Sequence, residues 1–502
     1  MSIRIYNVND SDEKYTAYRV FVNKKEVRLD CARASAFPIN RRWPGHQRQL
    51  EQTELINFLS FATDEEVLIE IIPLDDFEDV VVRPKSLGII PDITDGVISF
   101  KLKKPAYFTV EPYGRHNALH ILADPILEYN VDINSKDVIY YPKGVYEAGA
   151  IELKSNQTLF IDEGALVYGT VSATDAENIK IIGAGILDVS HTKEKILFES
   201  EDRNNTSAVK NAERIHTIQL NYCKNVEIDG ITVRDSLLYN IRPIACDNIY
   251  IHNFKTIGNW RYNSDGIDMH NCENVLIENC FLRTFDDTIC VKGFDCYYSE
   301  DVENAAEDAM WRNGRKHDSF KNITVRNCVI WNDWGKSLEI GAETRAEEIC
   351  DATFTDCDII HMTGYALDCC NVDYADVHDI LYKNINVEVD DIVPAPFYQS
   401  NNDEVYVNND IDYNPPIILS EVLFHEEYSA GGKRRGKNRK LTFENIHIYS
   451  NKKPKFAFSG YDEEHKTSDV LMKDIYINDK KIKDKTECIL KIFNFCENIV
   501  LE

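Results

Sequence analysis

Three stretches in the middle of the chain decide the fold: KNVEIDGITV (residues 224–233), DNIYIHNFKTI (247–257) and ENVLIENCFL (273–282). Each begins with a charged residue and an Asn, continues as a short alternating strand, and ends in a second apolar run. The Asn residues stand 23 positions apart from 225 to 248 and 26 apart from 248 to 274. A period of roughly 20–30 residues with two or three short strands predicts a parallel β-helix.

The same unit recurs ten times along the chain. Its leading residues are Asn156, Asn178, Asn225, Asn248, Asn274, Asn322, Asp351, Asp379, Asn445 and Asp474. Gaps of 47 residues (178 to 225) and 48 residues (274 to 322) fit an extra coil or a loop insertion, and the 66 residues from 379 to 445 predict a long loop insertion near 389–438. A leucine-rich repeat would need Leu-x-x-Leu-x-Leu spacing and a helix in each repeat, and neither is present.

The chemistry of a β-helix predicts where these residues lie. Val, Ile, Leu, Phe and Cys should stack inward on equivalent residues of the next coil, and the recurrent Asn should occupy a left-handed turn and form a side-chain ladder.

The first 125 residues follow another pattern. Runs such as YRVFVNKKEVRL (18–29), EVLIEIIPL (66–74) and YFTVEPY (107–113) alternate apolar and polar residues and are separated by Pro, Gly, Asn and Asp. This pattern predicts an antiparallel β-sandwich. We therefore expect an all-β chain with an N-terminal β-sandwich domain at 1–125 and a parallel β-helix domain at 126–502.

Composition excludes several classes of protein. The 502 residues are 43% hydrophobic and 28% charged, which is ordinary globular usage. No window approaches the roughly 20 apolar residues of a membrane helix, so we expect no membrane partner. The formal net charge of −28 disfavours nucleic-acid binding and also opposes acidic polysaccharides unless a local cation reverses the field. Composition leaves the oligomeric state open.

The N-terminus MSIRIYNVNDSDEKYTAYRV contains no apolar secretory signal, so we expect a cytoplasmic protein unless a signal has been removed. Its 14 Cys residues show no paired CxxC spacing that would indicate zinc. We expect them to be small buried thiols.

Acidic residues cluster on consecutive coils. Asp265 is followed 21 residues later by the adjacent pair Asp286 and Asp287, a separation of about one coil. Matching positions on neighbouring coils lie about 4.8 Å apart, so the three carboxyl groups should meet. They cannot all ionise normally, and one should retain a proton near neutral pH. A proton donor beside carboxylates that activate water is what glycoside hydrolysis requires, although Asp residues are also common at β-helix turns.

Three segments resemble motifs of family 28 glycoside hydrolases, the polygalacturonase group: YNSDG (262–266), FDDTIC (285–290) and LEIG (338–341). YPKGVYEAGAIELKSNQTLFIDEGALVYG (141–169) is also similar to the opening coils of that family. The resemblance covers residues 130–390 and implies a right-handed, pectin-lyase-like β-helix. A front sandwich joined to a β-helix resembles the family 49 dextranases.

The resemblance implies an inverting reaction with direct attack by water. By motif, Asp286 matches the general acid, and Asp265 and Asp287 match the pair that activates water. Neighbouring residues of a strand point to opposite sides, so Asp286 and Asp287 can both face the site only where the strand bends or ends. The mechanism requires no cofactor and no metal.

Two departures concern the substrate. Polygalacturonases carry Gly-His-Gly where this chain has Gly335-Lys336-Ser337, so the family's His matches Lys336. They also carry an Arg-x-Lys element one coil later that binds the uronate carboxylate. Here residues 361–373 contain no Arg or Lys, and Asp368 lies in that region. An Asp there opposes an anionic sugar, which favours a neutral or differently substituted glycan.

Further residues on the matched motifs are candidates for binding the substrate. They are Asn263, Lys292, Trp334, Lys336, Glu339, Glu343, Arg345 and Asp368. Trp faces stack on sugars and Arg binds hydroxyls, but a packing role for Trp334 and a surface ion pair between Glu343 and Arg345 are the alternatives. We expect His270 to be structural.

The leading hypothesis is an inverting glycosidase acting on an oligosaccharide or polysaccharide. Alternatives are a pectic hydrolase with a rearranged clamp, which Lys336 or Arg345 would provide, and a non-catalytic glycan-binding β-helix. A polysaccharide lyase is disfavoured because the basic pair is missing.

Overall fold

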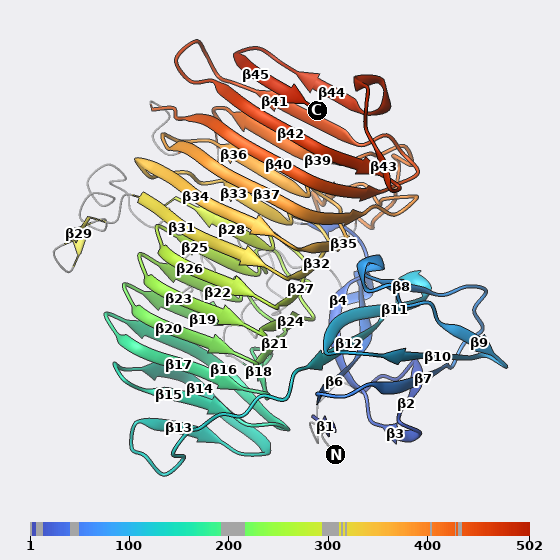
Figure 1. Cartoon of the computed structure of the whole chain (residues 1–502). Coiled ribbons are helices and arrows are strands. Elements are labelled where there is room, and N and C mark those ends of the chain that lie inside the picture. The colour runs from blue at the N-terminus through green and yellow to red at the C-terminus, as the bar shows by residue number, and fades with distance from the viewer. Residues whose placement is uncertain are drawn as a thin grey trace.

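The computed structural model describes residues 3–6, 14–40, 50–191, 216–293, 311–312, 315–316, 319–401, 404–426, 428–429 and 434–502. These residues form strands and three short 3₁₀ turns, η1 (Leu50–Gln52), η2 (Lys85–Leu87) and η3 (Lys485–Glu487). In the described ranges we find no helix with the length and hydropathy of a membrane span. The all-β prediction is confirmed, with a sandwich in front of a long parallel sheet (Figure 1).

The N-terminal domain consists of two packed sheets. The first contains β1 (Ile3–Ile5), β6 (Thr53–Thr63), β12 (Leu119–Asp124), β11 (Ala106–Arg115) and β8 (Val81–Arg83), with β4 (Asp30–Ser35) also paired to β6. The second contains β3 (Lys25–Val27), β2 (Tyr18–Val22), β7 (Val67–Pro73), β10 (Val97–Leu102) and β9 (Asp92–Thr94). Alternating Val, Ile, Leu and Phe side chains of both sheets fill one core between them.

The solenoid has three faces. The first face contains β13 (Val138–Tyr141), β15 (Thr158–Ile161), β17 (Glu177–Gly183), β20 (Lys224–Asp229), β23 (Asp247–His252), β26 (Glu273–Glu278), β31 (Ser319–Arg326), β34 (Glu348–Thr355), β37 (Asp376–Glu388), β40 (Lys437–Tyr449), β42 (Thr467–Ile477) and β45 (Cys496–Leu501). The second face contains β18 (Ile186–Asp188), β21 (Thr232–Arg234), β24 (Lys255–Ile257), β27 (Phe281–Thr284), β32 (Val329–Asn332) and β35 (Asp358–His361).

The third face contains β19 (Ile218–Asn221), β22 (Ile241–Ile244), β25 (Ile267–His270), β28 (Ile289–Lys292), β33 (Leu338–Gly341), β36 (Leu367–Asn371), β39 (Pro416–Val422), β41 (Lys455–Ser459) and β44 (Ile489–Ile492). β14 (Gly144–Leu153) and β16 (Ala165–Thr174) form the first coils, and β16 pairs with both β18 and β19. Outside these faces, among the described residues, β29 (Trp311–Arg312) pairs with β30 (Arg315–Lys316), and β43 (Lys480–Lys481) pairs with β42.

The predicted Asn ladder is confirmed. All ten leading residues have positive φ, between 51° and 64°. Asn178 donates to Asn156 at 3.0 Å, Asn225 donates to Asn178 at 2.8 Å, and Asn248 donates to Asn225 at 2.7 Å. Each amide therefore continues a chain of hydrogen bonds along the solenoid axis, which stabilises the turn that leads into the first face.

The assignment of the last two units to this ladder is wrong. Asp379 precedes Ile380, which pairs with Leu441, so the residue equivalent to Asp379 is Lys440. Asn445 instead donates to Asn384 at 2.9 Å and belongs to a second ladder at the opposite end of the same strands. Asp474 follows Asn445 in that second ladder. Each coil has two turns that favour Asn or Asp, and their local sequences are alike.

The long gaps are insertions rather than extra coils. Ile179 pairs directly with Val226, and Val275 pairs directly with Ile323, so the residues on either side of each gap lie on neighbouring coils. The segment 389–438 was expected to be a loop, but it contains the third-face strand β39 between β36 and β41. That segment therefore supplies one strand of a coil as well as its connections.

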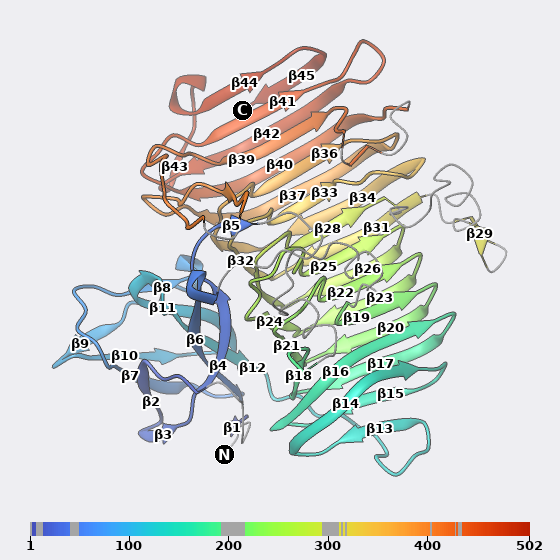
Figure 2. The ribbon, with the colours of Figure 1, turned by 180° about the vertical axis from the view of Figure 1, so that it is seen from behind.

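The sandwich packs against the second face of the solenoid, as both views show (Figures 1 and 2). Phe58 and Leu122 of the sandwich share an apolar cluster with Phe281 and Trp331 of the solenoid. The short strands β5 (Ile39–Asn40) and β38 (Phe397–Tyr398) pair across the junction, where Figure 2 shows β5. This contact holds the sandwich next to the edge where second-face strands turn into third-face strands.

The cysteines are buried as predicted. Twelve of the 13 cysteines in the described ranges are buried, and all 13 are free thiols. Eight of them lie in the solenoid core, where they act as small apolar side chains.

Candidate active site

Four neighbouring strands of the third face, β25, β28, β33 and β36, bring the acidic motifs together. Their alternation sends apolar side chains into the solenoid core and polar ones to the opposite side. In β25, Ile267 and Met269 lie in the core, while Asp268 and His270 face away from it. One row across the four strands consists of Asp268, Cys290, Glu339 and Asp368.

Asp265 and Asp287 lie in equivalent positions on neighbouring coils. Ile267 pairs with Ile289, so each Asp precedes its strand by two residues. The Gly266 amide donates to the carbonyl of Asp287 at 2.8 Å, which continues the pairing into the turns. The structure therefore places Asp265 one coil from the Asp286–Asp287 pair, as the spacing predicts.

Asp286 and Asp287 lie in the bend between β27 and β28. Strand alternation does not apply there, so both carboxyl groups can face the same side. The Asn263 amide donates to Asp286 Oδ2 at 3.2 Å, and the Asp287 amide donates to Asp286 Oδ1 at 3.2 Å. Asn332 Nδ2 donates to the Asp286 carbonyl at 2.7 Å and fixes the bend from the next coil.

Lys292 forms the centre of the carboxylate cluster. Its Nζ lies 3.3 Å from Asp265 Oδ2, 2.8 Å from Asp268 Oδ2 and 3.3 Å from Asp287 Oδ2. Only 4% of the Lys292 side chain is exposed. The sequence predicts Lys292 as a substrate-binding residue; its ammonium group is enclosed by carboxyl groups, and a contact with substrate stays a prediction.

The three candidate catalytic carboxyl groups differ in pKa. Burial and the neighbouring Asp287 raise the pKa of Asp286 to about 7. Burial also opposes ionisation of Asp287, but Lys292 and Lys336 outweigh it and lower the pKa of this carboxyl group. Burial and the adjacent Asp268 raise the pKa of Asp265 well above its ordinary value. Near pH 6 a protonated Asp286 therefore stands next to an ionised Asp287.

Lys336 lies beside this pair on the following coil. Its backbone amide donates to Asp287 Oδ1 at 3.1 Å. Its ammonium group is in contact with Glu339 and lies 3.4 Å from Asp368 Oδ2. The Lys336 side chain is 22% exposed, whereas those of Glu339 and Asp368 are fully buried. Of Lys336, Glu339 and Asp368, only Lys336 is partly accessible to solvent, and its ammonium group lies next to the other two residues' buried carboxyl groups.

The other residues predicted to bind substrate differ in where they lie. Asn263 is half-buried and contacts Asp286. Trp334 is 8% exposed, with its ring 5.9 Å from that of Phe285 and 4.8 Å from that of Tyr398. Trp334 therefore packs under the exposed Tyr398 and does not offer an open face to a sugar.

Glu343 and Arg345 are also buried, and Arg345 Nε lies 4.0 Å from Asp373 Oδ1. Because both are buried, the alternative of a surface ion pair is wrong, and their role as sugar contacts stays a prediction.

Sequence reasoning missed two residues of this site. Asp268 is the shortest contact of Lys292, and Asn332 holds the carbonyl of Asp286. Asp268 could have been found, because it lies in the same segment as Asp265 at an outward position of β25. His270 is fully buried, and burial lowers its pKa well below the ordinary value, which fits a packing role.

One group at the site has the residue types of a metal centre. Asp287, Cys290 and Glu339 place three ligand atoms within 4.8 Å of one another. The ammonium groups of Lys292 and Lys336 already contact Asp287 and Glu339, respectively. A metal ion would have to compete with both lysines for these carboxyl groups. The group therefore serves as a set of ion-pair partners for Lys292 and Lys336.

A β-helix in which a proton-bearing Asp adjoins an ionised Asp has the fold and the paired carboxyl groups of a glycoside hydrolase. The sequence profile of glycosyl hydrolases family 28 matches residues 144–408. This range exceeds half of the chain and contains all three candidate catalytic residues, and the chain belongs to this family.

Similar proteins agree with the family. A "Probable polygalacturonase" of Vitis vinifera is 26% identical over 185 residues, which cover 32% of this chain and 38% of that protein. A "Polygalacturonase" of Gossypium barbadense is 30% identical over 196 residues, covering 37% of this chain and 44% of that protein. The chain therefore matches less than half the length of these relatives.

The solved structure of Dex49A from Penicillium minioluteum has a similar fold. It superposes with a TM-score of 0.52 at 15% identity and covers 88% of this chain and 90% of that one. The match extends over both the sandwich and the β-helix, in line with the resemblance to family 49 seen in the sequence.

Proposed function

We propose that this protein is an inverting glycosidase in which Asp286 is the general acid and Asp287 is the general base. The observation that carries the proposal is the position of two adjacent carboxyl groups in one bend, with Lys292 in contact with Asp287. Burial raises the pKa of Asp286 to about 7, while Lys292 and Lys336 lower the pKa of Asp287. The two groups required for hydrolysis by inversion are thus available together in mildly acidic solution.

In this reaction Asp286 gives its proton to the oxygen of the leaving sugar as the glycosidic bond breaks. Asp287 accepts a proton from the water that attacks the anomeric carbon from the other side of the ring. Asp265 adjoins Asp287 on the previous coil and shares Lys292 with it. Because its pKa is raised, Asp265 serves this reaction as a hydrogen-bonding group that positions the water.

We further propose that the sugar at this site is not a free uronate. The partly exposed cation beside the bend, Lys336, contacts Glu339 and lies 3.4 Å from Asp368. A uronate carboxylate would have to compete with these two carboxyl groups, whose pKa values burial raises, for the ammonium group of Lys336. The two outward positions of β36 are Asp368 and Cys370, so that strand offers no cation. A neutral or substituted glycan fits this charge arrangement better than polygalacturonate.

The printed names of the relatives support a second candidate, a hydrolase of pectic oligosaccharides. For that substrate Lys336 would have to leave Asp368 and bind the uronate. The partial exposure of Lys336 is the observation that favours this alternative.

One screen distinguishes these functions. The wild-type protein and Asp286→Asn would be incubated with polygalacturonate, neutral pectic side chains, α-glucans, galactans and fructans, and reducing ends would be measured. Release from a neutral glycan that is lost in the variant supports the proposal, and NMR of the first product should show the inverted anomer. Release from polygalacturonate alone supports the second candidate. No release from any glycan would contradict both and favour a binding scaffold.

The charge argument has its own test. Asp368→Asn removes one of the two carboxyl groups behind Lys336 with little change in volume. The ratio of kcat/KM for a galacturonate oligosaccharide to that for the neutral substrate should rise by about 3- to 10-fold, since about 1 kcal/mol of ion pairing is released. An unchanged ratio would show that Lys336 does not determine the charge preference.

A further inference from the structure

A group of three ligand-bearing side chains lies on the outer side of the first face, away from the candidate active site. Ile349 and Val377 point into the core, so Glu348 and Cys350 of β34 and His378 of β37 project outward. Cys350 and His378 are directly paired across the two strands. We propose that Glu348, Cys350 and His378 form a site for a divalent metal ion of the zinc class.

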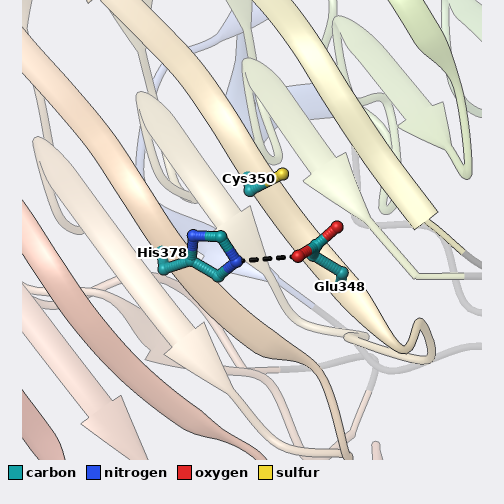
Figure 3. A group of neighbouring side chains, drawn as sticks. All are labelled: Glu348, Cys350 and His378. Atoms are coloured by element: carbon teal, nitrogen blue, oxygen red, sulfur yellow. Dashed lines mark hydrogen bonds and ion pairs between the residues drawn. The ribbon is translucent and has the colours of Figure 1, made fainter.

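The geometry suits a small tetrahedral ion. The carboxylate oxygen, thiol sulfur and ring nitrogen lie within 4.8 Å of one another, and His378 Nε2 is 2.9 Å from Glu348 Oε1 (Figure 3). Zinc bonds of about 2.0–2.3 Å place tetrahedral ligands about 3.3–3.8 Å apart. One nitrogen, one sulfur and one oxygen ligand would leave a fourth position for water.

The imidazole of His378 is already oriented for this role. Its Nδ1 lies 2.6 Å from Asp379 Oδ2, so Asp379 can accept the ring proton and leave Nε2 as the ligand atom. A carboxylate behind a ligating His is the usual second partner of a metal site. The thiol of Cys350 hydrogen-bonds to Asp351 Oδ2 at 3.8 Å. Burial raises the pKa of this thiol to about 12, so an ion that binds it must displace a proton.

The nearby cations are directed elsewhere. Arg439 of β40 is paired with His378 in the strand register, but its guanidinium binds Asp376 at 2.9 Å and 3.1 Å. On the preceding strand, Lys321 is directed toward Glu273 at 4.0 Å. The charged groups around the proposed metal site are four acidic residues, Glu348, Asp351, Asp376 and Asp379, and three basic residues, Arg439, Lys437 and Lys440.

A similar group on the first face is less suited to a metal. Glu227, Asp229 and His252 also lie within reach of a common ion. Lys180 Nζ, however, lies 2.6 Å from Glu227 Oε2, and this group contains no thiol. It therefore provides a matched control with the same strand geometry.

The test is a titration of the full chain with Co²⁺, followed by displacement with Zn²⁺. We expect one Co²⁺ per chain, a near-ultraviolet thiolate-to-cobalt band, tetrahedral d–d bands and the release of one proton per ion. Cys350→Ser should abolish the thiolate band and weaken binding by about 100-fold. Asp379→Asn should weaken binding by about 10-fold, as expected for the loss of a second partner.

Two control variants locate the ion. Cys496→Ser removes a half-buried thiol in the last coil, and His252→Gln alters the similar group on β23; both should leave the titration unchanged. A thiolate band that survives in Cys350→Ser, or binding that is lost in His252→Gln, would overturn the proposal. So would the absence of a thiolate band in the wild-type protein. The readout does not involve glycan hydrolysis, so failure here leaves the proposed glycosidase activity unaffected.

Discussion

Replacing Lys292 with Met is the most informative single change at the catalytic site. Met has nearly the same length and fits a buried position, but it removes the charge that contacts Asp265, Asp268 and Asp287. The side chain is only 4% exposed, so a substrate contact is not lost with it. The effect on activity therefore reports how far Lys292 keeps Asp287 ionised.

The structure sets the size of the effect. Two unit charges 3.3 Å apart, the distance from Lys292 Nζ to Asp287 Oδ2, interact by about 5 kcal/mol at an effective dielectric constant of about 20. Lys336 remains near Asp287, and entering water would recover part of this energy. A net loss of about 2–3 kcal/mol corresponds to about a 30- to 150-fold change. Because the pKa of Asp287 starts below its ordinary value, this loss appears on the acid limb of the pH profile: kcat/KM there should fall by about 30- to 150-fold, while KM and the activity at pH 6 change by about twofold or less.

The assay is a pH–rate profile on the glycan identified by the reducing-end screen. Lys292 favours the ionised forms of both Asp286 and Asp287, so its loss should move both limbs of the profile to higher pH. Lys292→Arg keeps the charge and should restore most of the wild-type profile. Thermal unfolding of each variant would verify that it is folded. A uniform loss at every pH, with no displacement of either limb, would refute the electrostatic role of Lys292.

Three further predictions concern protonation and the junction between the domains. Because burial raises the pKa of Asp286 to about 7, hydrolysis should fall about tenfold per pH unit above that value, and Asp286→Asn should remove this limb and lower kcat by about 10²- to 10⁴-fold in stopped assays. His361 is buried between Glu111 and Asp390, and these two carboxylates outweigh burial and raise the pKa of the imidazole. The stabilisation that His361 gives the folded state is therefore complete below about pH 6.5 and is lost as the pH rises through the raised pKa. In urea unfolding, His361→Gln should flatten that decline, and an equal decline in the variant would contradict this assignment. Lys255→Met leaves Asp124 buried without its partner at 2.8 Å and should lower the free energy of unfolding by about 3–5 kcal/mol; a loss below about 1 kcal/mol would show that the junction tolerates the change.

The solenoid could be predicted from the sequence because its period is short and local. Each Asn-led strand meets the same strand one coil later, so a separation of about 25 residues along the chain becomes contact between neighbours. Asn156 and Asn178 are 22 residues apart and joined by a 3.0 Å hydrogen bond. No long-range information is needed for such a prediction. The left-handed backbone at each leading residue follows from the same turn chemistry.

The predicted alignment of the coils was wrong where two kinds of turn have similar sequences. NINV (384–387) and DILYK (379–383) both begin at a residue with positive φ within the single strand β37. The next Asn-led segment, ENIHI (444–448), can be aligned with either of them. The hydrogen bond from Asn445 to Asn384 identifies the correct partner. Periodicity cannot make that choice, because the turns are five residues apart on every coil.

The site could be predicted only in part, for a related reason. The three Asp residues lie in recognisable motifs on adjacent coils, and their placement together follows from the period. Lys292 and Lys336 are 44 residues apart in sequence, yet β28 and β33 are direct neighbours. The inserted residues between them hide that relation from any spacing rule. Burial was also not predicted: Lys292, Glu339 and Asp368 are almost fully buried, and their role as sugar contacts stays a prediction.

The positions of the two lysines connect the catalytic chemistry with the choice of substrate. Lys292 and Lys336 both lower the pKa of Asp287, whereas burial raises the pKa of Asp265 and of Asp286. The same contacts occupy the positive charge of both lysines. A uronate at this position would have to draw Lys336 away from its carboxylate partners, and the stabilisation of ionised Asp287 would weaken as it did so. The arrangement that supports the general base therefore also disfavours an anionic sugar.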